Sequence, residues 1–197
     1  MRSLDRKMFV TAAAAVIAMR FVAGEAAAAG EKESFGIGRR VSESELAGWN
    51  IDVAPDGAGL PSGRGSVQQG KLVYESKCLA CHGAEGQGQP MDRLAGGQGT
   101  LSSANPVKTI GSYWPYATTV FDYVRRAMPL DKPQSLSADE TYAVTAYLLH
   151  LNGIVGPATV MNAQTLPKVQ MPNRTAFRSD PRPDVMSSAC RTDCDQD

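Results

Sequence analysis

Apolar residues recur at helical spacing in three segments of this chain. The segment 116–126 places Tyr116, Val120 and Val124 on one face and ends in two arginines, which suit the negative end of a helix dipole. The segment 69–78 predicts a shorter amphipathic helix that leads directly into a pair of cysteines. Both patterns are typical of helices that bury one side.

The third and clearest helix is predicted over 137–153. Ser137 and Glu140 have the spacing of a capping box at its start, and Asn152 with Gly153 is a typical helix end. There is no convincing alternating strand and no internal repeat, so the predicted fold class is all-α. The apolar stripe of this helix comprises Ala143, Val144, Tyr147 and Leu151.

The three helical segments lie within residues 66–155, and the pattern changes on either side. Residues 30–65 and 156–197 are poor in apolar periodicity and rich in turn-forming proline and glycine, which predicts two long irregular arms around one domain. Within the first arm, Ser42 begins another S-x-x-E pattern and predicts one short helix. A chain of 197 residues suits one modest domain with such extensions.

The N-terminus has the pattern of an export signal. Three basic residues precede the apolar run 8–19, and the small residues Ala27 and Ala29 form an A-x-A cleavage site. Arg20 ends the apolar run well short of the roughly 20 residues that a membrane-spanning helix needs. We therefore expect residues 1–29 to be a cleaved signal peptide, the mature protein to be periplasmic, and no transmembrane segment to remain.

The charge balance says little about partners. Lysine and arginine together number 20, and aspartate and glutamate also number 20. Nothing in this composition indicates a nucleic-acid-binding protein or a polybasic membrane anchor. Partner choice must therefore depend on local surfaces.

The pentapeptide CLACH carries the chemistry. Cys78 and Cys81 lie one helical turn apart, which suits two thioether bonds to the vinyl groups of one haem, and His82 can then ligate the iron. A redox dithiol also uses C-x-x-C, but it needs a preceding strand and a βαβ context that the pattern does not show. A zinc site could add Cys190 and Cys194, although their spacing is loose. The histidine that follows the second cysteine favours one covalent haem c.

The second axial ligand of such a haem is predicted to be Met128. It stands between two predicted helices, and Pro129 prevents the first helix from continuing, so this loop suits a cover over one haem face. Met91 follows His82 too closely to reach the opposite face without a very tight loop, and His150 fits the end of a helix. A His/Met pair fills both axial positions and favours one-electron transfer at raised potential. The remaining candidates are Met161, Met171 and Met186 in the second arm.

These motifs resemble the class I c-type cytochromes. The likeness rests on "GKLVYESKCLACHG", the "AMP" loop and the closing "AVTAYLLHL" helix, and it covers about residues 66–155. It implies a cytochrome c haem domain in which an N-terminal and a C-terminal helix cross beside the haem. By this resemblance, Gly70 and Tyr74 should contact Val144 and Tyr147.

A narrower likeness extends to the arms. "IDVAPDGAGLPSGRGSV", "PVKTIGSYWPYATTVFDYVRRAMP" and the tail "MPNR" resemble the haem c subunits that accept electrons from periplasmic molybdenum-containing sulfite or sulfane dehydrogenases of sulfur oxidation. The resemblance implies an electron-transfer subunit that catalyses no reaction itself and passes electrons to another cytochrome or an oxidase. One C-x-x-C-H motif implies a one-haem member. A free periplasmic shuttle, or a haem enzyme or sensor with an open sixth site, are the alternatives.

Two details of the site stay open in the sequence. Many class I cytochromes carry Pro-x-Leu after the haem motif, where the proline carbonyl accepts a hydrogen bond from the ligand imidazole. Here Pro90 stands two positions too early relative to Leu94, so the sequence does not identify the carbonyl that orients His82. Trp114 could donate to a haem propionate, as could Tyr113 or Tyr116, although core packing explains these aromatic residues almost as well.

The remaining cysteines lie in the polar C-terminal tail. Cys190 and Cys194 are expected to form a small disulfide after export, and a bond to a partner is the alternative.

Overall fold

The structure, a computed structural model, describes residues 37–179. The predicted signal peptide, residues 1–29, and the cysteines Cys190 and Cys194 lie outside the described residues. Residues 37–41 are exposed and form no helix or strand, and every described helix and strand lies from Glu43 onward. No described helix is long and apolar enough to cross a membrane.

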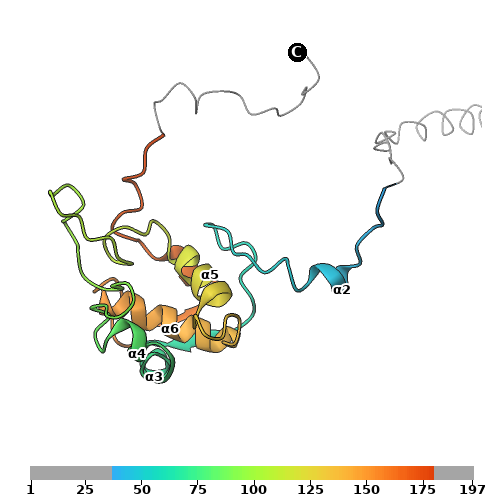
Figure 1. The fold of residues 1–197 in the computed structure, drawn as a ribbon, viewed down its shortest axis with the longest axis horizontal. Coiled ribbons are helices and arrows are strands. Elements are labelled where there is room, and N and C mark those ends of the chain that lie inside the picture. The colour runs from blue at the N-terminus through green and yellow to red at the C-terminus, as the bar shows by residue number, and fades with distance from the viewer. Residues whose placement is uncertain (1–36, 180–197) are drawn as a thin grey trace, which may run out of the picture. The chain divides into compact units, whose positions relative to one another are not determined.

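The main elements are three helices at the places where the sequence predicts them (Figure 1). They are α3 (Val67–Lys77), α5 (Ala117–Ala127) and α6 (Ala138–Leu151). Capping boxes begin two of them, from Ser66 to Gln69 and from Ser137 to Glu140, so that orphan backbone amides of the first turn are satisfied. The predicted helical fold class is confirmed.

Three shorter helices are also present among residues 37–179. α2 (Glu43–Leu46) begins at Ser42 with the predicted capping box, and α4 (Leu79–His82) holds most of the CLACH motif. The third is a 3₁₀ turn, η1 (Leu166–Lys168), in the C-terminal segment.

A small two-stranded sheet was not expected from the sequence. β1 (Arg64–Ser66) and β2 (Val160–Asn162) pair in antiparallel orientation, with Gly65 opposite Met161. Strands of three residues are too short to show an alternating pattern, and their pairing joins segments from opposite ends of the domain. The fold is therefore mostly helical, and this sheet joins the chain just before α3 to the chain after α6.

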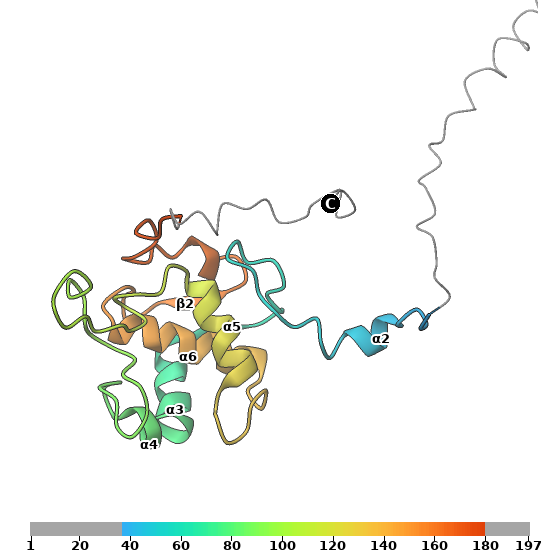
Figure 2. The ribbon, with the colours of Figure 1, turned by 45° about the horizontal axis from the view of Figure 1, so that its top comes forward.

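The crossing of α3 and α6 is tight and places glycine at the contact point. A Cβ atom at Gly70 would overlap the carbonyl group of Ala143 and come within 2.8 Å of the Cβ of Tyr147. One turn further along α3, the rings of Tyr74 and Tyr147 pack with their centroids 5.3 Å apart. This arrangement confirms the predicted helix crossing. At Gly70, however, the residue of α6 in contact is Ala143, where Val144 was expected. Figure 2 shows α3 passing α6 in a second view.

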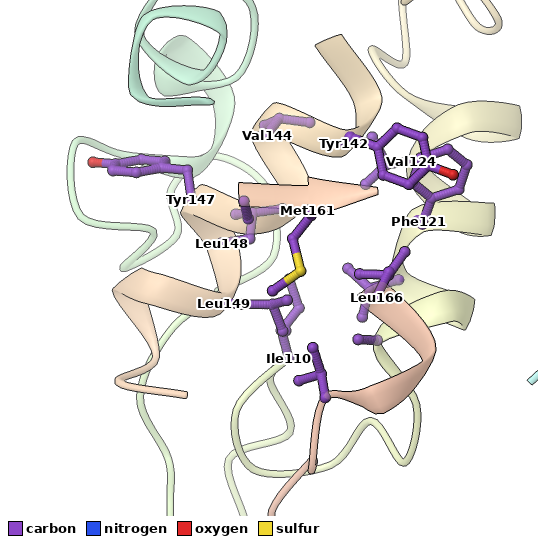
Figure 3. Packing of buried hydrophobic residues seen from close by; sticks show 14 of the residues in the cluster. Ile110, Phe121, Val124, Tyr142, Val144, Tyr147, Leu148, Leu149, Met161 and Leu166 are labelled. Carbon is purple, nitrogen blue, oxygen red and sulfur yellow. The ribbon is translucent and has the colours of Figure 1, made fainter. Parts of the chain in front are cut away.

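Residues of both arms contribute to the hydrophobic core. Val53 from the first arm is 5% exposed, and Met161 and Leu166 from the second arm are 2% and 0% exposed. In Figure 3, Met161 and Leu166 lie among side chains of α5 and α6. The domain boundaries at residues 65 and 156 stay a prediction. Both arms nevertheless contribute side chains to the hydrophobic core of the domain.

The first arm is also held to α5 by hydrogen bonds. The amide of Val53 donates to Asp122 Oδ1 over 2.8 Å, and Thr118 Oγ1 donates to the carbonyl of Pro55 over 3.0 Å. Arg125 Nη1 donates to the carbonyl of Ile51 over 3.0 Å. These bonds satisfy backbone groups that lie against a buried helix, so the segment from residue 51 has a fixed position on the domain.

Candidate functional site

The CLACH motif begins where α3 ends. Cys78 is the C-cap of α3, and its carbonyl accepts from the amides of Cys81 and His82 over 3.1 and 3.0 Å. This single helical turn brings both thiols and the imidazole to one place. Cys78 is half-buried against the core cluster, Cys81 is exposed, and both are free thiols.

The imidazole of His82 is oriented by a backbone carbonyl. Its Nδ1 lies 2.8 Å from the oxygen of Asp92. Because a carbonyl oxygen only accepts, Nδ1 carries the proton and donates it, and Nε2 keeps its lone pair. Nε2 has no hydrogen-bond partner among the described residues. The ring is thus held in the tautomer that a metal ligand needs.

Asp92 is the residue that the sequence did not identify. The loop of residues 83–98 folds back on the CLACH turn: the amide of Met91 donates to the carbonyl of Cys81 over 2.9 Å, and the amide of Leu94 donates to the carbonyl of Gly86 over 2.8 Å. These bonds fix the chain on both sides of Asp92. Asp92 stands two positions before Leu94, the place that the proline takes in Pro-x-Leu, so the register of Leu94 was the signal in the sequence and the place of Pro90 was not.

The environment of Cys78 argues against dithiol exchange. Burial raises the pKa of the Cys78 thiol to about 11, and the neighbouring Cys81 adds to this effect, whereas Lys77 opposes it. Exchange enzymes need a thiolate near neutral pH, which a raised pKa disfavours. No strand leads directly into the motif either, because α3 precedes it.

The two methionine candidates for an axial position differ in their surroundings. Met128 is the C-cap of α5, is half-buried and packs against the core cluster. Met91 is 44% exposed, and its amide is tied to Cys81, on the CLACH side of the molecule. Met128 thus lies at the end of a helix that is separate from the CLACH turn, and its role as an axial ligand stays a prediction.

The other candidate residues have protein partners. His150 Nδ1 lies 3.0 Å from the carbonyl of Val155 at the end of α6, which fits a structural role. Tyr113 packs against Phe177, and Arg174 lies over the ring of Tyr116.

Trp114 differs from these two tyrosines in its polar group. It is half-buried and packs edge-on against Tyr123 with ring centroids 5.8 Å apart. Its indole N–H has no hydrogen-bond partner among the described residues, so it stays free to donate to a bound anionic group.

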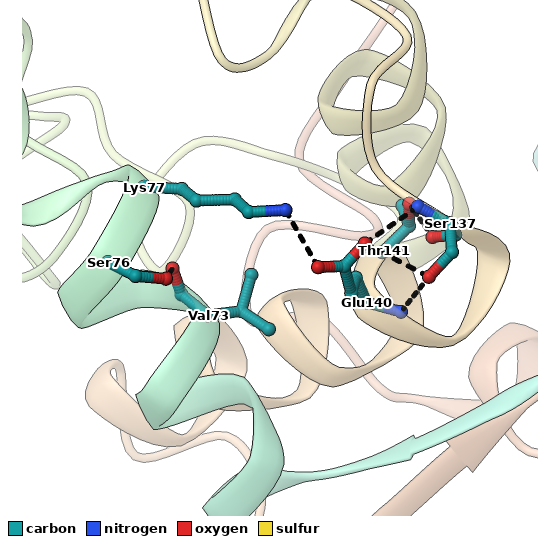
Figure 4. A network of polar contacts seen from close by, with 6 residues as sticks. All are labelled: Val73, Ser76, Lys77, Ser137, Glu140 and Thr141. Carbon is teal, nitrogen blue, oxygen red and sulfur yellow. Dashed lines mark hydrogen bonds and ion pairs between the residues drawn. The ribbon is translucent and has the colours of Figure 1, made fainter.

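An ion pair anchors the end of α3 beside the motif. Lys77 Nζ lies 2.7 Å from Glu140 Oε1, and the same carboxylate caps α6 through Ser137 (Figure 4). The hydrogen bond from Lys77, followed by those from Ser137, lowers the pKa of Glu140 below its ordinary value of 4.5. The residue before Cys78 is thereby joined to the first turn of α6.

The described residues fit a covalently bound haem c better than a metal ion held by protein side chains alone. Within residues 37–179, no group of three or more histidine, cysteine or acidic side chains could hold a metal ion. Two free thiols one turn apart and an imidazole with a free Nε2 are instead the groups that haem c attachment requires. Leu94, Trp114 and Met128 are partly buried apolar side chains that pack against the core.

Comparisons with known proteins agree with this interpretation. Residues 67–152 match the Cytochrome c family. The chain is also similar to a chain of the sulfane dehydrogenase SoxCD from Paracoccus pantotrophus, whose crystal structure superposes with a TM-score of 0.73 at 42% identity and covers 82% of each chain. The similarity thus extends well beyond the residues that match the family.

Two curated relatives are named thiosulfate dehydrogenase. The protein from Stutzerimonas stutzeri (strain A1501) is 31% identical over 90 residues, which is 45% of this chain. The protein from Psychrobacter arcticus is 27% identical over 110 residues, which is 50% of this chain. The aligned parts cover 28% and 31% of these two proteins' own lengths, so this chain corresponds to less than a third of either.

Proposed function

Because the chain belongs to the class I c-type cytochromes, we propose that it is a periplasmic one-haem electron-transfer subunit. It accepts electrons from a molybdenum-containing sulfite or sulfane dehydrogenase and passes them to another cytochrome or an oxidase. The observation that carries the proposal is the His82 imidazole, fixed by Asp92 with Nε2 free, beside two free thiols on one helical turn.

Four side chains hold the haem in this proposal. Cys78 and Cys81 would form the thioether bonds, His82 would ligate the iron through Nε2, and Met128 would ligate it through its sulfur. When bound, the haem iron takes up and releases one electron. The protein would supply the two side chains that ligate the iron, keep the imidazole oriented through Asp92, and exclude water with apolar side chains.

The similarity to the sulfane dehydrogenase supports the choice of partner. It spans 82% of this chain and therefore includes segments outside residues 67–152. A free shuttle would need only the family domain. The exposed apolar side chains of the first arm, Leu46 and Trp49 among them, suit contact with a partner's apolar surface.

A second candidate function comes from the names of the curated relatives. A chain related to thiosulfate dehydrogenases could itself oxidise thiosulfate at an open haem site. Thiosulfate added to the purified full-length protein, with an artificial electron acceptor, separates the two. Steady turnover without any other protein would favour the enzyme, whereas the electron-carrier proposal predicts none.

The haem and its export are tested together by intact mass measurement of the protein from periplasmic extracts. The proposal predicts a chain that begins at Gly30, carries the mass of one haem, and keeps that haem on a denaturing gel. Replacing both Cys78 and Cys81 by alanine should leave little folded cytochrome. Release of all haem by acidic acetone, or stoichiometric zinc in the purified protein, would contradict the proposal.

A further inference from the structure

Asn152 joins the end of α6 to the loop that orients His82. It is 8% exposed and caps the helix, where its Nδ2 donates to the carbonyl of Leu148 over 2.9 Å. The same Nδ2 donates to the carbonyl of Leu94 over 3.1 Å, and Oδ1 accepts from the amide of Gly96 over 3.1 Å. Capping a helix requires only the first of these bonds, so the others must serve the loop.

The side chain of Asn152 has no room to move. A Cβ atom at Gly111 would overlap its amide group, so the backbone at Gly111 closes over it directly. The backbone carbonyl of Asn152 also accepts from Gln98 Nε2 over 3.1 Å. One buried residue thus contacts the loop at three places, residues 94, 96 and 98.

These contacts affect the position of the Asp92 carbonyl, because the loop is held by hydrogen bonds on both sides of this residue. Leu94 is two residues after Asp92, and on the other side Met91 is tied to Cys81. Among the described residues, the hydrogen bonds that join the loop of residues 83–98 to α6 and its cap all involve Asn152. The remaining bonds of this loop run within it, to Tyr74, to the CLACH turn, to Thr100, or to Thr109 and Ile110. Asn152 therefore fixes the loop relative to the most buried helix of the domain.

We propose that Asn152 is a positioning residue for the haem ligand: by holding Leu94 and Gly96, it sets the hydrogen bond between His82 Nδ1 and the Asp92 carbonyl. This rests on the proposed function, since it requires that His82 ligates haem iron. A donated Nδ1 proton makes the imidazole a stronger electron donor, which stabilises the oxidised iron. Asn152 therefore keeps the reduction potential lower than a loosely held imidazole would.

The test compares full-length wild-type and Asn152→Ala proteins, both isolated from the periplasm with haem attached. We expect Asn152→Ala to shift the equilibrium constant for haem reduction roughly threefold toward the reduced form, the size of one weakened hydrogen bond. For a one-electron couple this is about 28 mV. The exchange of the His82 Nδ1 proton with solvent, followed by NMR in the reduced protein, should become faster.

Asn173→Ala is the matched control. Asn173 is 9% exposed, and its Nδ2 donates to the carbonyl of Tyr113 over 2.7 Å, with no hydrogen bond to the loop of residues 83–98. It should lower stability without changing the potential or the proton exchange. Equal shifts in both variants, or no shift in Asn152→Ala, would overturn the positioning role and leave Asn152 a helix cap.

Asn152→Asp serves where the alanine variant yields too little folded protein. Aspartate keeps the oxygen that accepts from the amide of Gly96, but it replaces the Nδ2 group that donates to the carbonyl of Leu94 by a second acceptor. We therefore expect the reduction potential to shift in the same direction as in Asn152→Ala. An unchanged potential and proton exchange would overturn the proposal. Failure of the proposed function would look different, because the wild-type protein itself would then carry no covalent haem or show no histidine ligation.

Discussion

At the scale of single residues, one helical turn brings together Cys78, Cys81 and His82, and the carbonyl of Asp92 accepts from the imidazole. Cys78, Cys81 and His82 follow from one pentapeptide, because covalent attachment and ligation need these residue types at this spacing. Asp92 stands two positions before Leu94, where Pro-x-Leu places its proline, but without a proline there only the folded loop shows that this carbonyl accepts from His82. Asn152 was recognised only as a helix end for the same reason.

Met128→Ala tests the second axial ligand. The variant should lose the weak long-wavelength sulfur-to-iron band of the oxidised protein, bind cyanide or carbon monoxide at the iron, and have a lower potential, because a thioether stabilises reduced iron. Met91→Ala is the control, since Met91 is exposed and tied to the CLACH side. Loss of the band in Met91→Ala with its retention in Met128→Ala would contradict the assignment.

At the scale of elements, helices were predictable because their signals are local. Capping residues and apolar periodicity lie within each of α3, α5 and α6. β1 and β2 have no comparable local signal, because each is three residues long and is stabilised by a partner far along the chain. The helix crossing was predictable only through the family resemblance.

Gly70→Ala tests the helix crossing. A Cβ at this position would overlap the carbonyl of Ala143, so α3 and α6 must move apart, and such overpacking costs about 1–3 kcal/mol or more. Denaturant unfolding of the haem-bound protein should show this loss in the free energy of unfolding. Gly156→Ala is the control, since its Cβ would meet nothing within 4 Å. Similar stability of both variants would contradict the close crossing.

At the scale of the whole molecule, composition was a poor guide to the arms. Their proline and glycine content correctly indicated little regular structure, yet Val53 and Leu166 are buried in the core and the first arm is hydrogen-bonded to α5. A few apolar residues spaced irregularly carry no period, so a pattern search cannot distinguish a packed arm from a free one. Deleting the arms would therefore remove core as well as partner contacts.

Asp122→Ala tests whether the first arm belongs to the domain. It would leave the buried amide of Val53 without its acceptor and break the pair with Arg126, at a cost of about 1–3 kcal/mol in the free energy of unfolding. Limited proteolysis should then cut more readily near residues 51–55. Asp56→Ala is the control, since Asp56 accepts only from Ala58 within the arm. Equal stability and equal cleavage would mean that the arm contributes nothing to the fold.

Stopped-flow haem reduction tests most directly the proposal that this cytochrome takes electrons from a molybdenum sulfur dehydrogenase. The full-length protein is mixed with the molybdenum enzyme that co-purifies with it from its own cells and with sulfite or a protein-bound sulfane sulfur. The account predicts rapid haem reduction only when enzyme and sulfur substrate are both present. No reduction by the complete mixture, or equally fast reduction by the substrate without the enzyme, would contradict it.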